Sequence, residues 1–230
     1  LGWCYEKGNG VTLNITEAKK WYQKAAAQGH EDAKKRLNEL NGSSSSSSSN
    51  YSSSGKTYKV GDYYNENGKE GVVFEVSADG RSGKIVSMKQ ADLQWSSDSA
   101  EQKRLIGADS ETDGAANMAK VMARPDWQSK YPAFKWCADL GEGWYLPSKE
   151  ELKVFTLNTA IHDAVNRTLI ARGGTKLYDK GESGWYWSST EDDYKSSSGE
   201  FYAWIVNMFN GYTFYNTKDF HNYVRAVSAF

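Results

Sequence analysis

The sequence is poor in the residues that build disulfide scaffolds and metal sites. It has 2 cysteines, 3 histidines and 3 prolines in 230 residues. Cys4 and Cys137 lie on either side of a serine run, which predicts two buried thiols rather than a disulfide. There is no Cys-x-x-Cys pair or Cys/His cluster, and His30, His162 and His221 are scattered. The sequence therefore predicts no metal site and no cofactor.

Charge and hydropathy argue against two further classes. The net charge is −1 and the isoelectric point about 6.4, whereas a general nucleic-acid binder carries a basic excess that neutralises phosphates. No apolar run approaches the roughly 20 residues of a membrane span. We therefore predict neither nucleic-acid binding nor a membrane span in this chain. No signal peptide is visible, but the chain begins at Leu1 in what reads as the middle of a repeat, so we expect a fragment of a longer protein.

Residues 1–41 contain two runs of small and apolar side chains at helical spacing. Asn14 and Glu17 are placed to form a capping box before the first run, and Gly29 ends it. The stretches LGWCYEKGNGV and EAKKWYQKAAAQGHEDAKKRL resemble a Sel1-like repeat, a relative of the tetratricopeptide solenoids. One helix pair cannot bury its apolar faces alone, so the resemblance implies further repeats upstream and a possible protein partner. A generic amphipathic hairpin is the alternative.

Residues 42–56 are serine-rich and have nothing to bury, which predicts a flexible linker between residues 1–41 and a second domain over 57–230. Short strands and turns dominate that domain, with a capping box at Ser148 and Glu151 before one helix. The predicted strands span 72–76, 83–87, 185–189, 201–208, 212–215 and 223–228. The predicted helices span 115–124, 131–138 and a stretch from residue 149 to about 169, while 90–113 is predicted to be loop-rich.

Six motifs follow one another in the second domain. They are DGAANM at 113–118, YPAFKWCADL at 131–140, GWYLPSKEEL at 143–152, GWYWSSTE at 184–191, YAWIVNMFNG at 202–211 and YVRAVSAF at 223–230. Their order resembles the bacterial DUF1566 family, which includes the carboxy-terminal domain of Legionella collagen-like adhesins. It is also similar to the formylglycine-generating-enzyme branch of the C-type-lectin fold. The resemblance implies an α+β, C-type-lectin-like domain after the helical hairpin and linker.

Several motif residues are expected to support this fold. The predicted core residues are Trp144, Leu146, Trp185, Trp187, Trp204 and Val206. Arg225 stands near the end of the chain, and we expect it to satisfy buried carbonyls or pair with an acid rather than bind a ligand.

The tail, residues 185–230, also resembles retroelement-diversified variable proteins, whose last strands and loops are rewritten at adenines in a template. The resemblance implies a fixed frame, namely Trp185, Trp187, Ser188, Ser189, Ala203, Trp204, Val206, Asn207, Gly211, Thr213, Lys218, Val224, Arg225, Ala226 and Val227. The positions between them carry the residue types that such rewriting produces, chiefly Tyr, Phe, Asn, Asp, His and Ile.

Aromatic residues make up 14% of the chain, and the tail is rich in them. Neighbours in a strand point to opposite faces, so Trp204 and Val206 share one face, assigned to the core, and Ile205 and Phe209 share the other. A dense cluster of exposed rings marks an interaction site, and Tyr with Asn and Ser is typical of antibody contact loops. The alternative is that both faces are buried between two sheets. The predicted ligand contacts are Tyr194, Phe201, Tyr202, Ile205, Phe209, Tyr212, Phe214, Tyr215, Phe220, His221, Asn222 and Tyr223.

Three function classes compete. The favoured one is a non-catalytic binding protein, at the bacterial cell surface or outside the cell, that recognises a protein or glycan. The second is an enzyme of the formylglycine-generating type, whose chemistry, as the family implies, needs a cysteine pair, whereas this domain has only Cys137. The third is a scaffold that acts through its Sel1-like repeats. The acidic stretch 109–114 resembles an oxygen-ligand loop, but a solvated loop and helix cap is the favoured interpretation, so calcium is not predicted.

Overall fold

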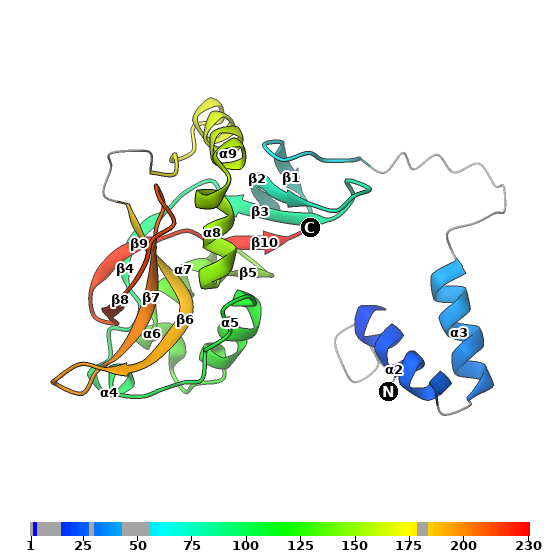
Figure 1. The fold of residues 1–230 in the computed structure, drawn as a ribbon, viewed down its shortest axis with the longest axis horizontal. Helices are drawn as coiled ribbons and strands as arrows, with labels where there is room; N and C mark the ends of the chain where they lie inside the picture. Colours follow the sequence, from blue (N-terminus) through cyan, green and yellow to red (C-terminus); the bar gives the residue numbers. More distant parts are fainter. Residues whose placement is uncertain (1, 4–14, 28–29, 43–55, 179–183) are drawn as a thin grey trace. The chain divides into compact units, whose positions relative to one another are not determined.

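The computed structural model of the chain describes residues 2–3, 15–27, 30–42, 56–178 and 184–230 (Figure 1). The chain divides into two compact units, Leu1–Ser54 and Gly55–Phe230. Cys4, Asn14 and most of the predicted linker lie outside the described residues. In the part that is described, no helix has the length and apolar character needed to cross a membrane.

The first unit contains two packed helices, α2 (Ile15–Ala27) and α3 (Glu31–Gly42). The buried residues Ala18 and Ala33, one from each helix, are small, which lets helix backbones approach closely. Gly2 has a similar role, because a Cβ atom there would lie 2.9 Å from the ring of Tyr22. The predicted helical hairpin is present.

The second unit is an α+β fold with two five-stranded sheets. Its strands are β1 (Tyr63–Glu66), β2 (Lys69–Val76), β3 (Gly83–Ser87), β4 (Ala91–Gln94), β5 (Trp144–Tyr145), β6 (Trp185–Lys195), β7 (Phe201–Asn207), β8 (Thr213–Thr217), β9 (His221–Val224) and β10 (Val227–Ala229). Its helices are α4 (Ser99–Gln102), α5 (Gly114–Met122), α6 (Trp127–Lys130), α7 (Pro132–Asp139), α8 (Lys149–Leu157) and α9 (Thr159–Ala171).

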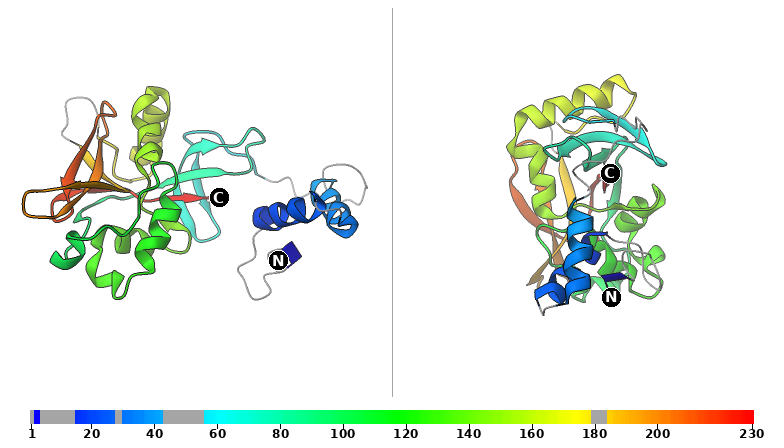
Figure 2. Two further views of the ribbon diagram at one scale, coloured as in Figure 1. Left: turned by 60° about the horizontal axis from the view of Figure 1, so that its bottom comes forward. Right: turned by 90° about the vertical axis from the view of Figure 1, so that its right-hand side faces the viewer.

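The first sheet has the order β1-β2-β3-β10-β5 and is antiparallel throughout. The second has the order β4-β9-β6-β7-β8, and only its β6–β9 pair is parallel. Helix α8 lies between the sheets, since Phe155 contacts Phe74 of β2 and the helix also packs on β6 and β7 (Figure 1). Helices α5, α6 and α7 lie on the opposite side of the unit from α9 (Figure 2).

Local turn chemistry explains the first hairpin. Asn67 and Gly68 join β1 to β2 with φ values of 54° and 74°. Two successive positive φ angles produce a turn whose twist matches that of the flanking strands, and Asn-Gly adopts them at low cost. This turn fixes the register that pairs Tyr64 with Gly71.

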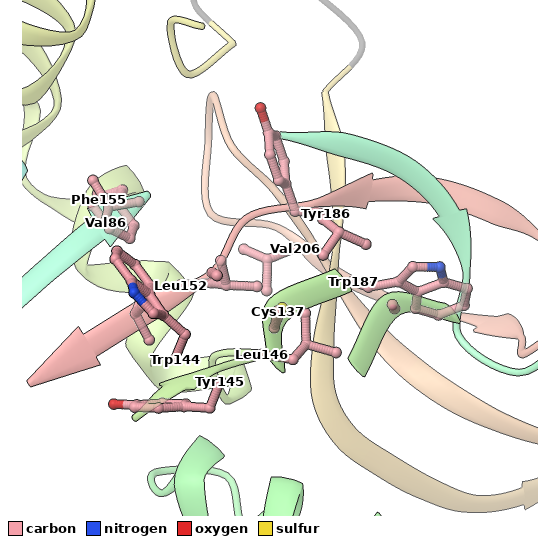
Figure 3. Close-up of a cluster of buried hydrophobic side chains, with 14 of the residues drawn as sticks. Val86, Cys137, Trp144, Tyr145, Leu146, Leu152, Phe155, Tyr186, Trp187 and Val206 are labelled. Carbon is pink, nitrogen blue, oxygen red and sulfur yellow. The ribbon is translucent and has the colours of Figure 1, made fainter. Parts of the chain in front are cut away.

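The core fills the space between the sheets and the helices (Figure 3). Four of the six predicted core residues are buried, namely Trp144, Leu146, Trp187 and Val206. Trp185 and Trp204 are half-buried instead. Cys137 is buried in α7, as predicted for this thiol, and burial raises its pKa well above the ordinary value.

The stretch 90–113 is loop-rich as predicted, although the four-residue elements β4 and α4 interrupt it. Another part of the sequence-based prediction was wrong in detail. The predicted strand over 223–228 is two strands, since β9 belongs to the second sheet and β10 to the first. Arg225 stands at this crossover. Its guanidinium is fully buried and donates to the carbonyl oxygens of Ser87, Thr175 and Lys176, which confirms its structural role.

The capping box at the start of α8 also ties α8 to other elements. The carboxylate of Glu151 accepts hydrogen bonds from the backbone N–H groups of Ser148 at 2.8 Å and Gly114 at 3.1 Å. It also accepts from the Tyr145 hydroxyl at 2.8 Å and the Lys84 ammonium at 3.0 Å. Burial alone would raise the pKa of Glu151, but these donors hold the pKa below its usual value.

The depressed pKa makes a prediction about acid stability. Glu151→Gln should destabilise the protein by about 1–3 kcal/mol at pH 7, because it weakens four hydrogen bonds to a buried carboxylate. The stabilisation by the ionised carboxylate is complete above the unfolded-state pKa of about 4.3 and is lost as the pH falls through the lower folded-state pKa. Urea unfolding should therefore show the difference between wild type and variant shrinking below about pH 4.3. Glu150→Gln is the control, and an equal difference at every pH would contradict this account.

Candidate functional site

Strands β6, β7 and β8 form the part of the second sheet that carries most predicted contacts. Directly opposed residues in an antiparallel pair point to the same face. Trp187 opposes Ile205, and Trp204 opposes Tyr215. Trp187 is fully buried, and its indole N–H donates to the Leu93 carbonyl oxygen at 3.0 Å. Ile205 therefore lies on the face of β7 that packs with Trp187. Val206, on the other face, is fully buried too, so both faces pack into the core at this end of β7.

This register corrects the predicted positions of Ile205, Phe201 and Trp204. Ile205 and Phe201, predicted as ligand contacts, are only 4% and 8% exposed, because alternate residues of β7 share the face of Trp187. Trp204, predicted as core, is half-buried on the opposite face. Asn222 is also buried, because β9 pairs with β4 and places it opposite Leu93. These three predicted contacts do not belong to an exposed surface.

A group of contacting rings, here called the ring cluster, lies over β6, β7 and β8. It consists of Tyr194, Tyr202, Trp204, Phe214 and Tyr215. Phe214 is paired with Ile205 and joins the group by stacking on Tyr215 at 4.8 Å. The centroids of Tyr202 and Tyr215 lie 4.7 Å apart, and Trp204 meets Tyr215 edge-on at 6.1 Å. Tyr194 stacks on Tyr202 at 6.0 Å, while Tyr194 and Phe214 remain 61% and 56% exposed. Ring–ring contacts of this kind contribute about 0.5–1.5 kcal/mol beyond burial, so the cluster is ordered without a ligand.

The β7–β8 connection carries two further exposed rings, Phe209 and Tyr212, the latter 71% exposed. Gly211 has a φ of 70°, and a Cβ atom there would lie 2.8 Å from the Thr156 hydroxyl oxygen and 3.3 Å from a methyl group of Leu157. The turn therefore packs beside the end of α8, where Leu157 is 72% exposed. Sequence reasoning missed Leu157, because nothing in α8 signals that it lies next to the tail.

The remaining predicted contacts lie around β9. Phe220 and His221 are exposed, and His221 Nδ1 lies 3.6 Å from a carboxylate oxygen of Asp92. Tyr223 is half-buried, and its hydroxyl forms a 2.6 Å hydrogen bond with that of Tyr178. The structure thus places the other nine predicted contacts in the ring cluster, at the β7–β8 turn, and around β9.

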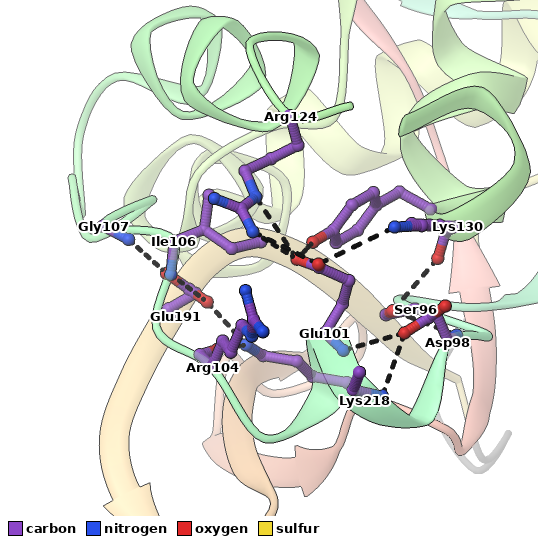
Figure 4. Close-up of polar contacts among 12 residues, drawn as sticks. Ser96, Asp98, Glu101, Arg104, Ile106, Gly107, Arg124, Lys130, Glu191 and Lys218 are labelled. Atoms are coloured by element: carbon purple, nitrogen blue, oxygen red, sulfur yellow. Dashed lines mark hydrogen bonds and ion pairs between the residues drawn. The ribbon is translucent and has the colours of Figure 1, made fainter. Parts of the chain in front are cut away.

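A buried ion pair supports this end of the sheet (Figure 4). Lys218 Nζ lies 2.5 Å from Glu191 Oε1, and both side chains are almost completely buried. Glu191 Oε2 also accepts hydrogen bonds from the backbone N–H groups of residues 106, 107 and 108 at 2.8–2.9 Å. Lys218 also donates to the Arg104 carbonyl oxygen at 3.0 Å. The pair therefore fixes the loop 104–108 to β6 and to the β8–β9 connection.

A second carboxylate, Glu101, fixes α4, which precedes this loop (Figure 4). Glu101 accepts hydrogen bonds from the Tyr131 hydroxyl at 2.6 Å and from the Arg124 guanidinium at 3.1 Å, and Lys130 Nζ lies 3.9 Å away. Burial alone would raise the pKa of Glu101, but the hydrogen bonds from Tyr131 and Arg124 hold the pKa below its usual value. The two anchored segments position one wall of a surface hollow.

The hollow has a volume of about 340 Å³ and lies between the 105–111 loop and the outer face of β6 and β7. It is lined by Leu105, Gly107, Asp109, Glu111, Glu191, Asp192, Asp193 and Trp204. Lys149 Nζ lies 4.3 Å from the centre of the Trp204 ring and 2.5 Å from Glu111. Asp109 pairs with Lys120 at 2.8 Å. The hollow thus combines an aromatic wall with a carboxylate rim.

Within the described ranges, no three His, Cys, Asp or Glu side chains are grouped so that they could hold a metal ion. In the stretch 109–114, Asp113 caps α5 by accepting from the Ala116 N–H at 2.9 Å, and Asp109 is paired with Lys120. The favoured interpretation of this stretch as loop and helix cap agrees with the structure.

The model of the Lcl C-terminal domain family matches residues 84–228, which include both sheets' central strands and the hollow. The chain belongs to this family. A Sel1 repeat matches residues 1–30, in agreement with the predicted resemblance. These two family matches do not bear on the predicted resemblance to retroelement-diversified proteins.

Individual proteins are also similar to parts of the chain. DAP3-binding cell death enhancer 1 of Rattus norvegicus is 60% identical over 40 residues, 17% of this chain and 8% of that protein. The Mus musculus protein of that name is 58% identical over 40 residues, again 17% of this chain and 8% of that protein. The chain therefore spans 8% of the length of these curated relatives. The crystal structure of a fimbrial protein from Bacteroides ovatus resembles the fold over 75% of this chain and 49% of the fimbrial chain, with a TM-score of 0.52 and 16% sequence identity. That likeness concerns the fold and agrees with the α+β class.

The anchoring by Glu191 and Lys218 can be tested directly. Lys218→Met leaves a carboxylate buried without its cation, which should cost about 3–5 kcal/mol of unfolding free energy. The control is Lys103→Met, because Lys103 is exposed and lies 3.8 Å from Glu200, and such a pair contributes about 0–1 kcal/mol. Urea unfolding at pH 7 measures both. Similar losses in the two variants would show that the buried pair is not the anchor.

Proposed function

We propose that the second unit is a non-catalytic recognition domain that binds a protein or glycan through the ring-rich end of its second sheet. One observation carries the proposal. In the described part of this unit, every exposed large aromatic residue lies between residues 194 and 220. They are Tyr194, Phe209, Tyr212, Phe214 and Phe220. Exposed aromatic groupings of this density are typical of interaction sites.

The rigidity of the support favours the same function. The rings of the cluster contact one another, and the strands beneath them are fixed by Glu191, Lys218 and Trp187. A surface that is ordered before binding loses less conformational entropy when a target arrives. Tyrosine also adds contact area at a low entropic cost, as in antibody loops. This supports binding to a macromolecular target over a purely structural role.

The absence of enzymatic activity is part of the proposal. The formylglycine-generating chemistry implied by the fold resemblance needs a cysteine pair, whereas Cys137 is buried in α7 and the pKa of its thiol is well above the ordinary value. Such a thiol is a poor nucleophile at neutral pH. We propose that the C-type-lectin-like scaffold acts here only as a support.

We also propose that the tail is a diversified region of the retroelement type. Most frame positions, including Trp187, Val206 and Lys218, are buried, whereas most positions between them are half-buried or exposed. Such a division lets the surface change while the core is kept. The test is the genomic neighbourhood. A reverse transcriptase gene and a near-copy of the last coding segment that differs at adenines would support this assignment, and their absence would remove it.

The Sel1 repeat has a separate proposed role, the docking of a protein partner. Helices α2 and α3 border a hollow of about 640 Å³ whose lining includes Trp3, Trp21 and Ala25. Exposed aromatic area at a concave helical surface is typical of repeat-protein binding faces. A place at the bacterial cell surface or outside the cell is also proposed, on the family resemblance.

The binding surface has a direct test. Phe209, Tyr212 and Phe214 are replaced together by Ser in the full chain, and ligands captured by the wild type are first selected from a peptide-display library and a glycan array. The variant should keep its thermal unfolding midpoint within a few degrees, since the three rings are exposed, and should bind at least about tenfold more weakly, since buried aromatic contacts dominate interfaces.

The matched control replaces three exposed apolar residues elsewhere, Met122, Leu140 and Ile170, by Ser. This control should bind like the wild type. A ring variant that fails to fold would show that the rings belong to the core. A ring variant that folds and binds normally would place the site elsewhere.

A further inference from the structure

We propose that the target is a protein, and that one of its lysine or arginine side chains enters the hollow beside Trp204. This inference rests on the proposed recognition function and specifies its ligand. The hollow and the ring cluster are adjacent, because Trp204 lines the hollow and is also a member of the ring cluster. A ligand on the ring cluster can therefore place a side chain in the hollow.

The first argument is charge. Five carboxylates line the hollow, and three have a cationic partner, since Glu191 pairs with Lys218, Glu111 with Lys149 and Asp109 with Lys120. Asp192 and Asp193 have no cation within 4.0 Å among the described residues. Two negative charges at the rim of a concave surface attract a cation from a partner.

The second argument is orientation. The Oδ1 atom of Asp192 accepts a hydrogen bond from the backbone N–H of Tyr194 at 2.8 Å, which fixes its side chain. Asp192 follows Glu191 directly in β6, and Glu191 is held by three backbone amides and Lys218. One carboxylate of the rim is therefore ordered before binding, so less entropy is lost when it pairs with a cation.

The third argument is that two residues of the hollow, Glu111 and Trp204, already contact an ammonium group. Lys149 is only 10% exposed, and its Nζ lies between the Glu111 carboxylate at 2.5 Å and the Trp204 ring at 4.3 Å. Cations are attracted to the face of an indole, and a carboxylate supplies the counter-charge. Asp192 and Asp193 offer the counter-charge for a second cation beside this indole.

This chemistry favours a protein over a glycan. A neutral sugar gains no Coulombic attraction from two unpaired carboxylates, and an acidic sugar is repelled by them. A basic side chain next to apolar residues on the target matches both the rim and the ring cluster. The volume of about 340 Å³ lies at the low end of the range for ligand sites, which suits one side chain.

The test is an NMR titration of the isotope-labelled full chain with N-acetyl-arginine amide. The probe is the indole N–H signal of Trp204, assigned from its disappearance in Trp204→Phe. N-acetyl-citrulline amide is the neutral ligand control, since it keeps the shape and lacks the charge. The arginine compound should shift the Trp204 signal in a saturable way, and the shift should weaken with added salt. The citrulline compound and methyl α-mannoside should leave it in place.

The matching variants separate charge from fold. Asp192→Asn with Asp193→Asn should weaken arginine binding roughly 2- to 30-fold, the effect of losing two exposed charge pairs. Asp139→Asn with Asp163→Asn removes the same charge from α7 and α9, outside the hollow, and should bind like the wild type.

Three results would overturn the inference: no Trp204 shift with the arginine compound, an equal shift with the citrulline compound, or undiminished binding by the Asp192/Asp193 variant. These results are independent of the recognition function, which the Ser substitutions at Phe209, Tyr212 and Phe214 test separately. A glycan target that needs those rings but not the two carboxylates would leave the recognition function intact and refute the basic side chain.

Discussion

Glu191 is buried in β6 and accepts hydrogen bonds from three successive backbone amides, while Lys218 supplies its counter-charge. The ammonium of Lys218 also lies 4.6 Å from the Trp95 ring. Burying two charges costs several kcal/mol per ion, and only good geometry with further hydrogen bonds offsets that cost. Here the pair joins three segments that are far apart in the sequence, and the aromatic and acidic walls of the hollow depend on their relative positions.

Arg225 performs the corresponding task between the two sheets. The chain leaves β9 in one sheet and enters β10 in the other. The Arg225 guanidinium donates to the carbonyl oxygen of Ser87 at the end of β3, to those of Thr175 and Lys176 after α9, and to Gln90, and Tyr186 also donates to Gln90. Strand β9 is therefore held at both ends, by Lys218 before it and by Arg225 after it, and the exposed aromatic residues lie upstream of Lys218 or between the two anchors.

Much of the fold could be predicted because its signals are local. The strand over 83–87 has the predicted bounds, and the Ser148–Glu151 capping box begins α8 as predicted. Strand β4 could not be predicted, because four residues with little alternation become a strand only by pairing with β9. The face of β7 could not be predicted either. Alternation separates Trp204 from Ile205, but both are apolar, and the choice between them depends on the long-range pairing with Trp187.

The same limitation explains which parts of the site were missed. The predicted contacts came from residue type within the tail, so Leu157 of α8 and the loop 105–111 were outside that reasoning. Phe201, Ile205 and Asn222 have the residue types of a diversified surface but occupy buried positions. If the tail varies as proposed, these three positions restrict which variants fold, since a charged or much smaller residue there leaves a buried polar group or a cavity. The variable surface is then limited by the packing of β7 and β9 and not by residue type.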